Sequence, residues 1–130
     1  MSGISTIFVY GTLKSGFGNH CVLKKGSRFV CDAITDKPYL FLKHGLPFVI
    51  NDSDDFKSVR VHGEVYEVTD ETLEDLDILE GHPNFYERKP IWVINKEGKK
   101  FYAWIYFITD GFLNIDECKH IEDGIFKKEK

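Results

Sequence analysis

Glu80 is the acidic residue whose position in the sequence best suits proton-transfer chemistry. It follows a helical row of three leucines, Leu73, Leu76 and Leu79. In an α-helix Glu80 lies about 40° from the centre of this row, whereas Asp77 lies about 100° away. A carboxyl group directed at a core has a raised pKa and can exchange protons near neutral pH. A glutamate that curls back to solvent, or that pairs with Arg88 or Lys89, explains the same pattern equally well.

A glycine-rich loop near the N-terminus is the second candidate for chemistry. It follows the predicted strand Thr6–Tyr10 and contains Gly11, Gly16 and Gly18. A Walker loop would need lysine and a hydroxyl residue after Gly16, and a dinucleotide fingerprint would need glycine at Cys21, so both patterns fail. The backbone N–H groups of such a loop can instead hold a carboxylate or an oxyanion. On the chain alone, glycines that only allow tight turns are the simpler explanation.

Other common catalytic patterns are missing from the sequence. The five histidines include no pair at i, i+4 on a helix, and the three cysteines lack metal-like spacing. Ser15 has Leu13 two residues before it, where a nucleophile elbow needs glycine. An odd number of cysteines with no framework indicates reduced thiols in a cytoplasmic protein. Tyrosines such as Tyr10, Tyr86 and Tyr106 could donate a phenol to a ligand or simply pack in the core.

The bulk composition narrows the class of protein. The chain has 130 residues, of which 42% are hydrophobic, so we expect one domain, 1–130, with a packed core. A net charge of -4 argues against a nucleic-acid partner, which requires a basic surface. No apolar run reaches the ~20 residues of a membrane helix, and the N-terminus lacks a secretion signal. We therefore expect a cytoplasmic protein with no membrane partner, and favour a monomer.

Strands dominate the elements that must position these groups. We expect strands over Thr6–Tyr10, Arg28–Thr35, Tyr39–Leu42, Pro47–Ile50, Val59–Val68, Ile91–Ile94 and Phe101–Phe107. A helix is expected from Asp70 to the residue before Gly81, and the spacing within Asn114–Phe126 hints at a second short helix. This order predicts an α+β fold whose mostly antiparallel sheet curls or closes into a small barrel.

Five groups of residues, in order along the chain, resemble the γ-glutamyl cyclotransferase-like (AIG2-like) superfamily. They are Phe8–Lys14 (FVYGTLK), Leu46–Ile50 (LPFVI), Gly63–Val68 (GEVYEV), Leu76–Gly81 (LDILEG) with Pro83 and Tyr86–Arg88 (YER), and Ala103–Tyr106 (AWIY). The opening motif and the Asn19-His20 pair after it are most similar to γ-glutamylamine cyclotransferases. The resemblance implies a small, mostly antiparallel β-barrel flanked by a few helices.

The resemblance also implies an enzyme of the γ-glutamyl cyclotransferase type. Such an enzyme cyclises a small γ-glutamyl substrate, such as γ-glutamyl-ε-lysine, to 5-oxoproline and releases the free amine without cofactor or metal. The family's acid/base glutamate falls on Glu80, and Tyr86 and Tyr106 match pocket positions. The family's ligand loop falls on Tyr10, Gly11, Thr12 and Leu13. His82 departs from the family pattern, and beside Glu80 it could alter the acid/base role of that residue.

Three alternatives stay open at this point. The chain could be a non-catalytic module of the same fold that binds a small ligand, and His82 beside the acid gives this some weight. It could be a cyclotransferase for another γ-glutamyl compound, because no local motif encodes the leaving group. It could also be a structural domain with an incidental cavity. Release of 5-oxoproline from a panel of γ-glutamyl compounds distinguishes these alternatives.

Overall fold

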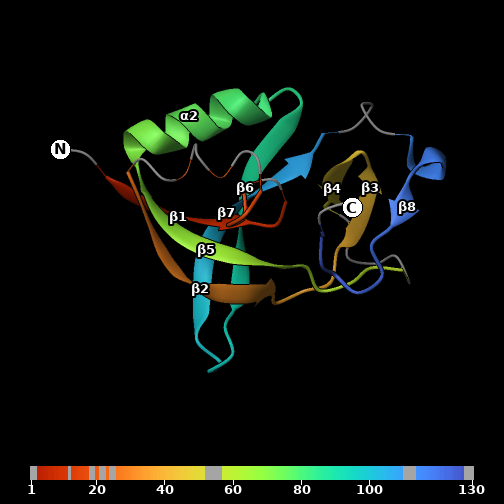
Figure 1. Ribbon diagram of the computed structural model, residues 1–130, viewed down its shortest axis with the longest axis horizontal. Helices are drawn as coiled ribbons and strands as arrows, with labels where there is room; N and C mark the ends of the chain where they lie inside the picture. Colours follow the sequence, from red (N-terminus) through yellow and green to blue (C-terminus); the bar gives the residue numbers. More distant parts are fainter. Residues whose placement is uncertain are drawn as a thin grey trace.

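The computed structural model describes residues 3–11, 13–17, 20, 23, 26–51, 57–109 and 114–127. Its strands are β1 (Ile4–Val9), β2 (Ser27–Thr35), β3 (Leu40–His44), β4 (Leu46–Ile50), β5 (His62–Thr69), β6 (Tyr86–Ile94), β7 (Lys100–Ile108) and β8 (Lys119–His120). An α-helix, α2 (Asp70–Glu80), and a 3₁₀ helix, η1 (Ile115–Glu117), are also present. Figure 1 shows the barrel strands with α2 lying over one end of them and the small sheet to one side.

Five strands close into a barrel in the order β1-β5-β2-β6-β7 (Figure 1). Successive pairs are antiparallel except the closing pair, in which β1 runs parallel to β7 and Ile7 lies opposite Trp104. A second sheet has the order β4-β3-β8. Closure satisfies the backbone groups that an open sheet would leave at its edges. The expected α+β fold with a mostly antiparallel barrel is confirmed.

Two apolar clusters hold these layers together. One joins the barrel to the small sheet and includes Phe8, Val65, Phe41 and Val49. The other lies between the barrel and α2 and includes Ile7, Val9, Val68, Leu73 and Leu76. Neighbouring residues of β1 therefore contribute to different cores, because side chains alternate between the two faces of a strand. The second half of β1, Ile7–Val9, is buried on both sides, and the loop that follows the strand starts from this buried end.

The ends of α2 follow local capping rules. The Thr69 side chain accepts a hydrogen bond from the Thr72 N–H at 3.3 Å, as an N-cap residue does. At the other end Gly81 has φ 67°, and its N–H donates to the carbonyls of Asp77 and Ile78. This left-handed conformation is easily adopted only by glycine, so the helix stops directly after Glu80.

The main differences between the predicted and the observed elements concern β6, β5 and the segment after Asn114. Strand β6 begins at Tyr86, not Ile91, because it pairs with β7 along its whole length although Pro90 interrupts the apolar pattern. Strand β5 begins at His62, and Val59 forms only an isolated bridge with Tyr39. Within Asn114–Phe126, where the spacing hinted at a short helix, only the three residues of the 3₁₀ helix η1 are helical. No helix in the described part of the chain is long and apolar enough to cross a membrane.

Candidate active site

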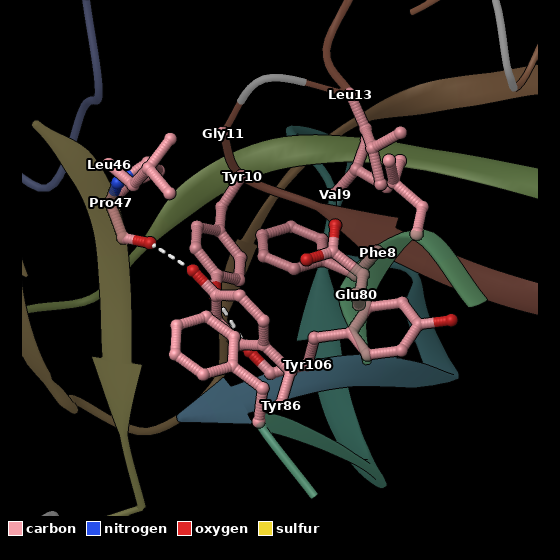
Figure 2. A pocket seen from close by; sticks show the side chains of 12 residues that line it. Phe8, Val9, Tyr10, Gly11, Leu13, Leu46, Pro47, Glu80, Tyr86 and Tyr106 are labelled. Carbon is pink, nitrogen blue, oxygen red and sulfur yellow. Dashed lines mark hydrogen bonds between the residues drawn. The ribbon is translucent and has the colours of Figure 1, made fainter. Parts of the chain in front are cut away.

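A cavity of about 140 Å³ lies between the loop after β1, the start of β4, the end of α2 and strands β6 and β7 (Figure 2). Its lining includes all of the predicted site residues that the structure describes: Tyr10, Gly11, Leu13, Glu80, Tyr86 and Tyr106. Thr12 was also predicted to bind substrate, but it lies outside the described residues. Residues far apart in the sequence therefore meet at one cavity.

The carboxyl group of Glu80 points into this cavity from the last residue of α2 (Figure 2). No hydrogen bond or ion pair to it is found in the described part of the chain. Burial without a compensating charge raises the pKa of Glu80 from its usual 4.5 to about 7. The inward direction that the helical pattern predicts is thus present, and at neutral pH this carboxyl can both accept and release a proton.

The loop after β1 approaches the small sheet closely at Gly11. A Cβ atom at this position would lie 2.5 Å from Cγ of Pro47, so only glycine fits without displacement of β4. The Lys14 N–H donates to the Gly11 carbonyl at 3.0 Å and closes a turn. Within the described residues, no acceptor is found for the N–H groups of Gly11 and Leu13. These two backbone donors beside the cavity therefore have no acceptor among the described residues.

The three tyrosines of the cavity use their hydroxyl groups inside the fold. The Tyr10 hydroxyl donates to the Tyr106 carbonyl at 2.6 Å, and the Tyr86 hydroxyl donates to the Pro47 carbonyl at 2.9 Å (Figure 2). The Tyr106 hydroxyl donates to Oδ1 of Asp77 at 2.7 Å. Burial is the main cause that raises the pKa of each phenol well above its usual value. These residues supply rings to the cavity wall, and their protons are already engaged.

Sequence reasoning missed Asp77, which it placed beside or away from the buried face. The Asp77 side chain is only 19% exposed and forms a salt bridge with Arg88. Burial alone would raise the pKa of Asp77, but hydrogen bonds from Arg88 and Tyr106 outweigh it and hold the pKa below its usual value. His82 packs here too, since its Nδ1 accepts from the Arg88 N–H at 3.1 Å. The YER motif contains Arg88, but it gives no sign of this partner.

The prediction that all three leucines of the helical row are buried was also wrong, at its C-terminal end. Leu73 and Leu76 are buried, but Leu79 is 42% exposed at the cavity and Leu46 opposite is 47% exposed. Phe85 and Pro47 add further apolar surface to the lining. A helical wheel gives the direction of a side chain but not whether another element covers it. The mouth of the cavity is therefore apolar.

A larger groove of about 470 Å³ lies elsewhere on the barrel. It is lined by Lys14, Asp32, His62 and Glu64 together with residues of the β6–β7 hairpin. None of the predicted site residues contributes to it. In the described residues no group of three or more His, Cys, Asp or Glu side chains is arranged to hold a metal ion.

Comparison with known proteins is consistent with this fold and cavity. The profile of the family described as "Gamma-glutamyl cyclotransferase, AIG2-like" matches residues 7–128. A candidate γ-glutamylcyclotransferase of Methanocaldococcus jannaschii is 41% identical over 104 residues, which are 80% of this chain and 84% of that protein. A Bos taurus protein named γ-glutamylaminecyclotransferase is 38% identical over 97 residues, which are 69% of this chain and 56% of that protein.

Among solved structures, an AIG2-like protein of Mus musculus superposes with a TM-score of 0.80 at 25% identity, covering 98% of this chain and 97% of that one. The two proteins therefore share this α+β fold. The chain belongs to the γ-glutamyl cyclotransferase, AIG2-like family. It is thus an enzyme of the γ-glutamyl cyclotransferase type that acts on a small γ-glutamyl substrate, and the resemblance drawn from the five motif groups is confirmed.

Proposed function

We propose that this chain is a γ-glutamylamine cyclotransferase, which converts a γ-glutamyl amine into 5-oxoproline and the free amine. The observation that carries the proposal is the charge of the cavity. Apart from the tyrosine phenols, Glu80 is the one ionisable side chain among its described lining residues. The names of the vertebrate relatives at 38% identity support the same substrate class.

The leaving group is where γ-glutamyl substrates differ. In a γ-glutamyl amino acid, a carboxylate lies two bonds from the nitrogen of the scissile amide. At this cavity that carboxylate would face Glu80 and the apolar side chains of Leu46 and Leu79, with no cation in the described lining to pair with it. An unpaired charge in such surroundings is costly. An amine such as the side chain of lysine presents methylene groups there and keeps its charges further out.

The size of the cavity is consistent with binding of the glutamyl part alone. A cavity of about 150 Å³ accommodates a benzene-sized group, and the present one has about 140 Å³. The amine would therefore extend through the mouth, where Leu46 and Leu79 are partly exposed. This division would fit the absence of a local sequence motif for the amine.

The loop after β1 would orient the substrate. The N–H groups of Gly11 and Leu13, which have no acceptor among the described residues, can donate to the α-carboxylate of the glutamyl group, as backbone nests do for anions. Since the reacting amine and carbonyl belong to one molecule, fixing that carboxylate restricts the rotations that separate them. Pre-orientation of tethered groups supplies much of the acceleration of such reactions. Backbone donors of the same loop can also stabilise the oxyanion.

Glu80 would move the proton. The α-amine of the substrate is mostly protonated at neutral pH, because its pKa is about 7.7 or higher. Glu80 accepts this proton, and the amine then attacks the γ-carbonyl carbon to form the new ring bond. Glu80 returns the proton to the leaving nitrogen as the amide bond breaks, so the carboxylate is regenerated. The second proton that the ring nitrogen must lose passes to the released amine, which leaves as an ammonium ion. Neither water nor an enzyme nucleophile is consumed.

The pH dependence of kcat/KM should show the raised pKa of Glu80. The base must be ionised to accept a proton, so the rate should fall about tenfold per pH unit below pH 7, which is about where burial sets the pKa of Glu80. An acidic limb near pH 4.5 would instead indicate an ordinary exposed carboxylate. Circular dichroism at each pH controls for unfolding.

A substrate panel tests the function itself. The protein is incubated with γ-glutamyl-ε-lysine and other γ-glutamyl amines, with γ-glutamyl amino acids and with glutathione, and 5-oxoproline is measured. We expect turnover of the amines and at least tenfold lower kcat/KM for the other two groups. Preference for γ-glutamyl amino acids or glutathione would contradict the proposed substrate. Thermal stabilisation by these compounds without turnover would favour a binding module.

A further inference from the structure

The last turn of α2, which carries Glu80, is not held by apolar packing. Leu73 and Leu76 are buried earlier in the helix, whereas Ile78 and Leu79 are 80% and 42% exposed. The direction of the Glu80 side chain therefore depends on other contacts of this turn. Asp77, one helical turn before Glu80, provides them.

The Asp77 carboxylate accepts hydrogen bonds from two strands of the barrel. From β6, Arg88 donates through Nε at 2.8 Å to one oxygen and through Nη2 at 3.0 Å to the other. From β7, the Tyr106 hydroxyl donates at 2.7 Å. Both charged side chains are largely buried, with 19% of Asp77 and 18% of Arg88 exposed. A two-bond pair of this kind fixes orientation as well as distance.

Arg88 is itself held in place. Its guanidinium group lies over the ring of Trp104, 4.3 Å from the centroid. Its backbone N–H donates to the ring nitrogen Nδ1 of His82. The backbone N–H of His82 in turn donates to the backbone carbonyl of Asp77 at 2.9 Å. The end of α2 is therefore tied to β6 through both side-chain and backbone groups.

The same contacts extend to the loop on the other side of the cavity. Tyr106 donates to Asp77 through its hydroxyl, and its carbonyl accepts from the Tyr10 hydroxyl. Tyr10 directly precedes Gly11. A continuous chain, Arg88–Asp77–Tyr106–Tyr10, thus links the helix end that carries Glu80 to the loop that faces it.

We propose that Asp77 and Arg88 are positioning residues, which fix the Glu80 carboxyl against the loop Tyr10–Leu13. They also keep the Tyr106 hydroxyl hydrogen-bonded to Asp77, so that it does not donate to Glu80. This inference rests on the proposed function of Glu80. Asp77 and Arg88 do not line the cavity, so they act through the residues they hold. Misplacement of a reacting group by about 1 Å can reduce a rate by about 100-fold.

The two residues should affect Glu80 in opposite directions. The groups that face Glu80 are the phenols of Tyr10, Tyr86 and Tyr106, and the groups next to it on the helix and β6 are Asp77, Arg88 and His82. Asp77→Asn leaves the Arg88 cation unpaired and weakens the hold on the Tyr106 proton, and both effects favour ionised Glu80. Arg88→Gln leaves the Asp77 anion unpaired, which favours protonated Glu80.

Steady-state kinetics test the positioning role. Asp77→Asn and Arg88→Gln should lower kcat for 5-oxoproline release about 10- to 100-fold, with a smaller change in KM. Arg88→Lys keeps the charge but loses the two-bond geometry, so its kcat should be intermediate. Asp75→Asn, an exposed residue of the same helix, is the matched control and should retain wild-type kcat. Rates are measured well below each melting temperature, so that loss of folded protein does not contribute.

A carboxyl ¹³C NMR titration of Glu80 gives a second readout that needs no substrate. The pKa of Glu80 should fall in Asp77→Asn and rise in Arg88→Gln, which a purely structural role does not predict. Wild-type kcat in both variants, or shifts of the pKa in the same direction, would overturn the proposal. If the wild-type protein releases no 5-oxoproline, the proposed function fails, and the titration alone decides whether Asp77 and Arg88 set the state of Glu80.

Discussion

Glu80→Gln should abolish measurable release of 5-oxoproline while the protein stays folded. Glutamine has the shape of the protonated glutamate but cannot take up and return a proton. Loss of a general acid–base group typically costs about 10²- to 10⁴-fold in rate. Here one carboxyl serves both proton transfers, so we expect the upper part of that range. The measurement is 5-oxoproline formation at pH 8, where the wild-type carboxyl is ionised.

The same substitution should make the protein more stable above pH 7 and leave its stability unchanged near pH 4. Burial raises the pKa of Glu80 to about 7 in the folded state, so the folded protein binds this proton more tightly than the unfolded chain. Ionisation therefore lowers the free energy of unfolding as pH rises from about 4.5 through 7. Glutamine avoids that cost. Melting temperatures of both proteins at pH 4 and pH 8.5 check the sign.

Tyr10→Phe is the matched comparison for Glu80→Gln. It removes the 2.6 Å hydrogen bond to the Tyr106 carbonyl but leaves the backbone of the loop and the acid in place. We expect a milder loss of activity. Full activity in Glu80→Gln would exclude Glu80 as the acid/base group, and complete loss in Tyr10→Phe alone would show that the loop contributes more than backbone donors.

Gly11→Ala should weaken both the fold and the catalysis. The new methyl group would lie 2.5 Å from Pro47 Cγ, and the rigid proline ring cannot turn aside. Either the loop or β4 must move, and both border the cavity. Overpacking of this kind costs about 1–3 kcal/mol of unfolding free energy. We expect kcat/KM at least tenfold below wild type, measured together with denaturant unfolding.

A second substitution identifies the cause. Pro47→Ala removes the Cγ atom that the new methyl group meets, so Gly11→Ala/Pro47→Ala should be more stable and more active than the sum of its single changes predicts. Contacting residues commonly show coupling of about 0.5–3 kcal/mol in such cycles. Additive effects would contradict the steric explanation and would assign the loss to the backbone of Gly11 itself.

Local sequence patterns predicted the parts of the molecule that depend on local chemistry. The limits of α2 follow from Thr69 and Gly81, which act through their own neighbours. The inward direction of Glu80 follows from helical geometry. The network around Asp77 could not be found in this way, because its partners Arg88 and Tyr106 arrive from two strands whose registers no local pattern specifies.

The same limit applies to the strands and to the tyrosines. Strand β6 was predicted five residues too short, since Glu87–Pro90 lacks an apolar pattern and the ladder with β7 determines its start. The motifs indicated that Tyr86 and Tyr106 belong to a pocket, and their rings do line the cavity. The hydrogen-bond acceptors of their hydroxyl groups, Pro47 and Asp77, depend on how the small sheet and the helix pack against the barrel.

The parallel pairing of β1 with β7 has a consequence for the protein during its synthesis. The hydrogen bond from Tyr10 to Tyr106 joins residues 96 positions apart in the sequence. Both halves of the cavity therefore exist together only after β7 has left the ribosome. Until then one edge of β1 has no partner strand and is open to association with other chains. Joining such distant segments is also slow, because the entropy of closing a long loop must be overcome first. Catalytic competence is therefore among the last properties that the nascent chain acquires.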